Sequence, residues 1–106
     1  MKWIKVEREP GLARVVFQMD RLDARVAEQV RAEITTALPR ENLQVELDLS
    51  QVEFADSMGI SVFLMAFKLL PSGAPRMRLC GCRPQLRQVL DLVNLSHVCD
   101  ISPVTP

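Results

Sequence analysis

Two neighbouring polar residues, Asp56 and Ser57, have the clearest chemical potential in the chain, because they stand directly before a long apolar segment. Short polar side chains at such a place are typical of a helix N-terminus, where their oxygens accept hydrogen bonds from free backbone N–H groups. Capping the helix is the commonest role of a serine there. A hydroxyl at the mouth of a helix is also suited to carry a phosphate, because the N-terminal amides and the helix dipole favour an anion.

A catalytic alternative uses the same serine. The segment 55–59 approaches the G-x-S-x-G motif of hydrolases, and Asp91 and His97 follow in the order of a hydrolase triad. The first glycine of that motif is absent, His97 is the only histidine, and 106 residues are too few for the hydrolase fold. We therefore expect no enzymatic activity.

A metal site is the second alternative. Cys80, Cys82 and Cys99 could be combined with His97 as zinc ligands. The single residue between Cys80 and Cys82 is not the spacing of a zinc motif, and the chain has no glycine-rich phosphate loop. We therefore expect no metal, no ATP and no other cofactor.

The segment around Ser57 predicts a strand, a turn and a helix. Val45, Leu47 and Leu49 alternate with polar residues, which indicates a strand. The helix that follows, over 58–70, is apolar nearly all round, and it is much shorter than the roughly 20 residues that a membrane span needs. We expect no insertion into a membrane.

The two faces of this helix follow from a rotation of about 100° per residue. The face that we expect in the core contains Ile60, Phe63, Leu64, Phe67 and Leu70. The opposite face contains Met58, Ser61, Val62, Met65, Lys68 and Leu69. Apolar side chains on an outer face are typical of an interaction surface, so we expect this second face to bind a partner protein.

The other segments predict the order β-β-α-β-α-β-α with a last edge strand. In addition to the strand and helix above, we expect strands over 3–6, 12–19, 77–80 and 98–101. We expect one helix from Ala24 to about Leu38, capped by Asp23, and another from Pro84 to Asn94. The inner face of the second helix contains Leu86, Val89, Leu90 and Val93. This order predicts an α/β fold in one domain over 1–106. The mixed sheet begins with an antiparallel hairpin and continues with β-α-β units. The core covers about 3–101, and the tail over 102–106 is frayed.

The charge balance excludes several classes of partner. The chain has 13 basic and 13 acidic residues and a formal net charge of zero, so nothing favours nucleic acid or an anionic membrane surface. The first residues lack the apolar stretch of a signal peptide. An odd number of cysteines without such a signal favours reduced thiols in the cytoplasm.

The run Asp48-Leu49-Ser50-x-Val52-x-Phe54-x-Asp56-Ser57-x-Gly59-Ile60 resembles the signature of the STAS domain, the fold of bacterial anti-sigma-factor antagonists. The order of elements is also that of STAS domains. The resemblance implies that Ser57 is a phosphorylation site flanked by Asp56 and Gly59, with the acidic Asp23 nearby. Two positions differ from the common family pattern: Met58 replaces a small or hydroxyl residue, and Asp20 replaces a glycine.

The resemblance also implies a mechanism of action through binding. The unphosphorylated protein would bind a serine kinase of the histidine-kinase-like ATPase fold that also restrains a sigma factor. Phosphorylation of Ser57 would break that complex, and a metal-dependent phosphatase would restore it. Other STAS domains imply a second role, as scaffolds or accessory subunits of signalling or lipid-transport complexes.

Overall fold

A hairpin opens the fold, as the sequence predicted. Its strands are β1 (Ile4–Glu9) and β2 (Leu12–Phe17), which pair antiparallel from Ile4 opposite Phe17 to Glu9 opposite Leu12. Gly11 in the turn has a φ of 77°, a left-handed conformation that glycine adopts without a steric cost.

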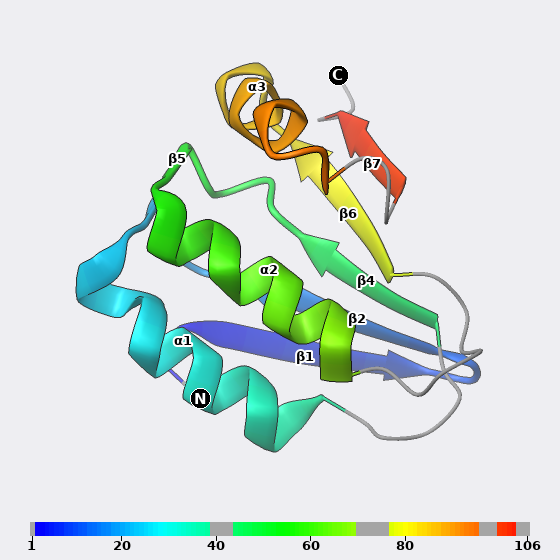
Figure 1. Cartoon of the computed structure of the whole chain (residues 1–106). Coiled ribbons are helices and arrows are strands. Elements are labelled where there is room, and N and C mark those ends of the chain that lie inside the picture. The colour runs from blue at the N-terminus through cyan, green and yellow to red at the C-terminus, as the bar shows by residue number, and fades with distance from the viewer. Residues whose placement is uncertain (1, 39–43, 70–76, 96–99, 104–106) are drawn as a thin grey trace.

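The computed structural model describes residues 2–38, 44–69, 77–95 and 100–103 (Figure 1). After the hairpin the elements are β3 (Arg21–Leu22), α1 (Ala24–Ala37), β4 (Gln44–Asp48), β5 (Phe54–Ala55), α2 (Ser57–Leu69), β6 (Met77–Cys82), α3 (Pro84–Leu92) and β7 (Asp100–Pro103). The predicted α/β class and order of the main elements are confirmed. The sequence did not predict β3 and β5, because two residues are too few to show a period.

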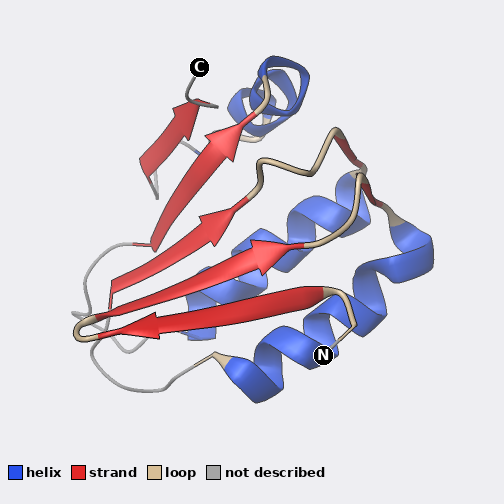
Figure 2. Cartoon of the chain, turned by 180° about the vertical axis from the view of Figure 1, so that it is seen from behind, coloured by secondary structure: helices blue, strands red, loops and turns tan. Residues whose placement is uncertain are grey.

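The main sheet has five strands in the order β1-β2-β4-β6-β7. Among the strands that the structure describes, only β1 and β2 run antiparallel, while β2, β4, β6 and β7 pair parallel, so the sheet is mixed. The helices α1 and α2 lie side by side against one face, and none of the described helices covers the opposite face, which is turned to the viewer in Figure 2. In the described part of the chain, no helix is long and apolar enough to cross a membrane.

The uncovered face of the sheet carries a row of alternating charges. The strand registers place one residue from each strand at this level, namely Glu7, Arg14, Glu46, Arg78 and Asp100. The guanidinium of Arg14 lies 3.7 Å from a carboxylate oxygen of Glu7 and 3.3 Å from one of Glu46. The hydrogen bond with Glu46 raises the pKa of Arg14. Arg78 lies 3.9 Å from the other oxygen of Glu46, so the pairs form a network rather than isolated contacts.

The orientation of α2 differs from the prediction. Val62, which we expected on the partner-binding face, is fully buried, and Leu64, which we expected in the core, is exposed. The buried residues of α2 are Gly59, Ile60, Val62, Phe63 and Ala66. The helix is covered on one side by the sheet and on another by α1, so its buried face is rotated toward α1. Since α2 is apolar nearly all round, its periodicity could not determine this rotation.

Three further boundaries are corrected. The strand β4 ends at Asp48, so Leu49 and Ser50 lie beyond it, although Leu49 is fully buried. Val93 was expected on the inner face of α3, yet it follows the end of the helix and is exposed. Ser102 and Pro103 belong to β7, so the expected frayed tail does not begin at 102. The earlier part of the predicted edge strand, over 98–99, lies outside the described residues.

Candidate functional site

Asp56 holds the N-termini of two helices. Its Oδ1 accepts a hydrogen bond of 2.9 Å from the N–H of Gly59 in α2, and its Oδ2 accepts one of 3.0 Å from the N–H of Ala24, the first residue of α1. Its backbone carbonyl accepts the first helical bond of α2, from Ile60. Asp56 is therefore the N-cap of α2, and one carboxylate satisfies free amides of both helices.

Ser57 is the first residue of α2, and its side chain is exposed. Because Asp56 caps the helix, Ser57 does not, and its hydroxyl has no hydrogen-bond partner among the residues that the structure describes. An exposed hydroxyl that carries no structural bond can be modified without loss of a native contact. This arrangement separates the two roles that the sequence left open, with the cap on Asp56 and a free hydroxyl on Ser57.

Asp23 is the N-cap of α1, as the sequence predicted, and basic side chains surround its carboxylate. Its Oδ1 accepts from the N–H of Arg25 at 3.1 Å, while its Oδ2 lies 3.1 Å from the guanidinium of Arg25 and 3.6 Å from that of Arg21. The hydrogen bond with the Arg25 side chain holds the pKa of Asp23 below its ordinary value. A carboxyl with a lowered pKa stabilises the fold above its unfolded pKa, and that contribution is lost as the pH falls through the folded pKa.

The short strands β3 and β5 bring these capping residues together. They pair parallel, with Arg21 opposite Phe54 and Leu22 opposite Ala55, and the guanidinium of Arg21 lies 4.6 Å from the centre of the Phe54 ring. The N–H of Asp56 then donates to the carbonyl of Leu22 at 3.3 Å. The beginnings of α1 and α2 thus lie next to each other at one end of the sheet (Figure 1).

Gly59 allows α2 to approach β3. A Cβ added at Gly59 would lie 2.0 Å from the carbonyl oxygen of Leu22 and 3.0 Å from its carbonyl carbon. No side chain fits at such a separation, so this position requires glycine. The spacing of Asp56, Ser57 and Gly59 therefore has a structural reason, because the first residue caps the helix, the second is exposed and the third makes the close contact.

An apolar groove of about 540 Å³ lies between the start of α2 and the end of α3, and Ser57 is one of its lining residues. Four of its lining side chains are among the exposed large apolar residues of the described chain: Phe54 at 41%, Leu64 at 40%, Leu92 at 82% and Val93 at 49% exposed. Its other lining residues are Ala55, Asp56, Ile60, Ser61 and Val89. Sequence reasoning missed this surface because Leu92 and Val93 meet α2 only in the folded chain.

The predicted partner-binding face of α2 is divided by the structure. Met58 and Lys68 are exposed, whereas Ser61, Met65 and Leu69 are half-buried and Val62 belongs to the core. Side chains of α1 explain the partial burial. Arg31 donates to the hydroxyl of Ser61 at 3.4 Å, and the hydroxyl of Thr35 lies 3.6 Å from the sulfur of Met65.

The cysteines of β6, Cys80 and Cys82, do not line the groove that contains Ser57. Cys82 is buried, and burial raises the pKa of its thiol to about 11, which keeps it protonated and unreactive near neutral pH. Among the described residues, no group of three potential metal ligands occurs. His97 and Cys99, which complete the hydrolase and zinc alternatives, lie outside these residues.

Comparison with known proteins agrees with this architecture. The family model of the STAS domain matches residues 4–105. The anti-sigma-B factor antagonist of Listeria monocytogenes is 28% identical over 89 residues, which are 84% of this chain and 78% of that protein.

Solved structures share the fold. An anti-sigma-factor antagonist (STAS) domain protein from Planctomyces limnophilus has a TM-score of 0.85 at 23% identity, covering 96% of this chain and 90% of that chain. The Bacillus cell fate determinant SpoIIAA in its phosphorylated form has a TM-score of 0.66 at 23% identity, covering 92% and 89% of the two chains. The chain belongs to the STAS domain family and, within it, is similar to anti-sigma-factor antagonists.

Proposed function

We propose that the protein is a partner-switching regulator that binds an anti-sigma factor and is released from it by phosphorylation of Ser57. One observation carries this proposal: Ser57 is exposed, its hydroxyl makes no hydrogen bond in the described structure, and the residue lines an apolar groove. The anti-sigma-B factor antagonist of Listeria and the phosphorylated form of SpoIIAA support the same role. The protein acts in the cytoplasm by binding rather than by catalysis, and it needs no cofactor.

The partner in this proposal is an anti-sigma factor that is also a serine kinase of the histidine-kinase-like ATPase fold. A metal-dependent serine phosphatase removes the phosphate and restores binding. The unphosphorylated surface around Ser57 is largely apolar, so a partner gains stability by covering it. Phosphoserine adds a charge of about −1.5 to −2 at pH 7, and a bound partner would have to remove water from that charge. Phosphorylation therefore opposes the complex without unfolding the domain.

We expect Ser57→Asp to weaken binding to the cognate kinase at least about tenfold, because an unpaired charge at an apolar interface costs several kcal/mol and each 1.4 kcal/mol is a factor of ten. Ser57→Ala should bind as the wild type does, and the phosphorylated protein should bind more weakly than Ser57→Asp. Calorimetric titration of the kinase with the four proteins measures this order.

Thr36→Asp is the matched control, since it adds the same charge at an exposed position of α1. It should leave the affinity unchanged. If the wild type, both Ser57 variants and the phosphorylated protein bind the kinase with equal affinity, phosphorylation of Ser57 does not control binding.

The groove between α2 and α3 is the partner-binding surface that we propose in place of the whole outer face of α2. Leu92→Lys should weaken kinase binding about tenfold or more, because Leu92 is the most exposed of the large apolar side chains here and a lysine in its place would have to be desolvated. The substitution should change the free energy of unfolding by no more than about 0.5 kcal/mol, as is usual at exposed sites.

Gln88→Lys is the control for this variant, because Gln88 is exposed one turn earlier on α3 and does not line the groove. Gln88→Lys should bind the kinase with the affinity of the wild type. If Gln88→Lys and Leu92→Lys bind equally well while Met65→Lys does not, the partner binds the α1 side of α2 instead.

A further inference from the structure

The row of alternating charges on the uncovered face ends at β1, the edge strand of the sheet. Its last member is Glu7, which follows Arg14, Glu46 and Arg78 across the strands. Lys5 lies on the same face of β1, with its ammonium 3.6 Å from the carboxylate of Glu7. Glu9 lies on this face as well, so the edge presents one positive side chain, Lys5, followed by two negative ones, Glu7 and Glu9.

The backbone groups that face outward from β1 follow from its pairing. The carbonyl of Trp3 accepts a hydrogen bond of 2.9 Å from the N–H of Gln18, so the backbone groups of Lys5, Glu7 and Glu9 also point toward β2. Those of Ile4, Val6 and Arg8 point outward. A carboxylate oxygen of Glu33 already accepts from the N–H of Ile4 at 3.2 Å, which leaves the later part of the edge for another strand.

We propose that this edge pairs with the β1 edge of a second copy of the chain, antiparallel about a twofold axis at Val6. In this register Val6 lies opposite Val6 of the second copy, and Lys5 lies opposite Glu7 of the second copy. Each copy would donate from the N–H groups of Val6 and Arg8 and accept at the carbonyls of Ile4 and Val6.

Charge complementarity favours a second copy of the chain as the strand that pairs with this edge. A second copy in this register places a lysine opposite Glu7, so the alternation along Arg78, Glu46, Arg14 and Glu7 continues across the junction. A twofold axis at Glu7 instead would place Lys5 opposite Glu9, but it would also place two glutamates opposite each other, and like charges at opposite positions are unfavourable. The charges of β1 therefore favour the register about Val6, because it pairs Lys5 with Glu7 and places no like charges opposite each other.

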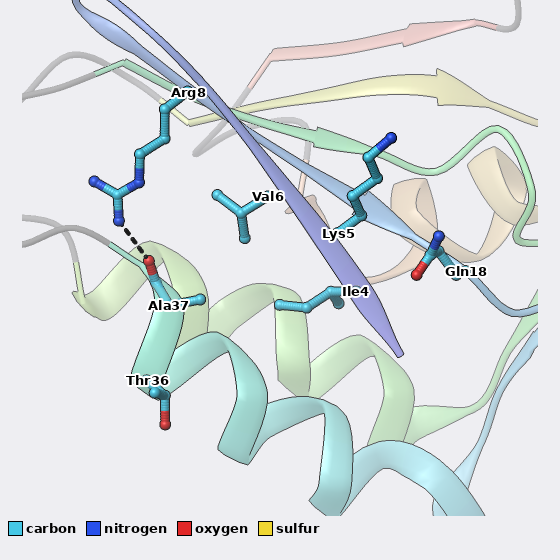
Figure 3. A pocket seen from close by; sticks show the side chains of 7 residues that line it. All are labelled: Ile4, Lys5, Val6, Arg8, Gln18, Thr36 and Ala37. Carbon is cyan, nitrogen blue, oxygen red and sulfur yellow. Dashed lines mark hydrogen bonds between the residues drawn. The ribbon is translucent and has the colours of Figure 1, made fainter. Parts of the chain in front are cut away.

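The helix side of the edge has room for the second strand. An open cavity of about 690 Å³ lies between β1 and α1 and is lined by Ile4, Lys5, Val6, Arg8, Gln18, Thr36 and Ala37 (Figure 3). Ile4 and Val6 point toward α1 while Lys5 points away from it, and the guanidinium of Arg8 donates to the carbonyl of Ala37 at 3.1 Å. In the proposed register, Val6 of the second copy enters this space against Val6. The pairing thus buries apolar side chains below the sheet and matches charges above it.

Sedimentation equilibrium tests the proposal on the complete chain. The wild type should show a concentration-dependent dimer by about 1 mM, the weak end of specific association, and added salt should weaken it. Lys5→Glu places glutamates opposite each other, and Glu7→Lys places lysines opposite each other, so each variant alone should dimerise at least about tenfold more weakly. An equimolar mixture should recover association, because the glutamates at positions 5 and 7 of one variant then face the lysines at positions 7 and 5 of the other.

Lys68→Glu and Glu28→Lys are the controls, because they make the same charge changes at exposed positions of α2 and α1. Both should dimerise as the wild type does. Circular dichroism establishes that each variant is folded, and the recovery on mixing requires folded chains. A wild type that stays monomeric at the highest concentration overturns the proposal, as does a dimer that neither variant weakens or a mixture that does not recover. Since no variant alters Ser57 or the groove, the result is independent of the proposed function.

Discussion

Replacing Gly59 with alanine should lower the free energy of unfolding by about 3 kcal/mol, at the upper end of the range for overpacked sites. In an isolated helix the same change would stabilise by about 1 kcal/mol, because alanine favours helix more than glycine does. The new Cβ would lie 2.0 Å from the carbonyl oxygen of Leu22, and a backbone atom cannot move aside as the end of a flexible side chain can. The cost of the steric clash with Leu22 is therefore larger than the gain from the higher helix propensity of alanine. Urea unfolding of the variant and the wild type measures the difference.

Gly11→Ala is the comparison for this substitution. A Cβ added at Gly11 would meet no atom within 4 Å, and φ there is 77°, so alanine costs only the left-handed conformation, about 1 to 2 kcal/mol. Gly59→Ala should be the more destabilising of the two. A Gly59→Ala protein as stable as the wild type would show that α2 can move away from β3 without cost.

Removing the carboxylate of Asp56 should cost about 2 to 3 kcal/mol, because two helix N-termini lose a charged acceptor together and a single cap contributes about 1 kcal/mol. Asp56→Ala loses the bonds to both Gly59 and Ala24. Asp56→Asn keeps one carbonyl oxygen but has no second acceptor, so it should lose about half as much. Chemical denaturation of both variants gives these differences directly.

Ser57→Ala is the discriminating control for Asp56, because the adjacent hydroxyl makes no bond in the described structure. It should change the free energy of unfolding by less than about 0.5 kcal/mol, as expected for an exposed site. If Ser57→Ala lost about 1 kcal/mol and Asp56→Ala lost nothing, the cap would belong to Ser57 and its hydroxyl would not be free.

The sequence by itself determined the fold class and the position of Ser57 at the start of a helix. The period of two in β4 and the spacing of four residues in α1 are local signals, since each arises from one strand or one helix with a single buried face. The caps are local as well: Asp23 accepts from Arg25 two residues later, and Asn94, with a φ of 59°, follows Val93, the C-cap of α3. Ser57 was placed at the start of α2 by the same kind of signal.

Only the tertiary structure decided which side of α2 is buried, which residue caps it and where the apolar groove lies. An apolar helix has no polar face to orient it, so the buried position of Val62 and the exposure of Leu64 depend on where α1 and the sheet lie. The second bond of Asp56, to Ala24, joins residues far apart in the chain through β3 and β5. The groove likewise needs Leu64 and Leu92 from two helices. Contacts between elements leave no period in a sequence, so these features appear only when the chain has folded.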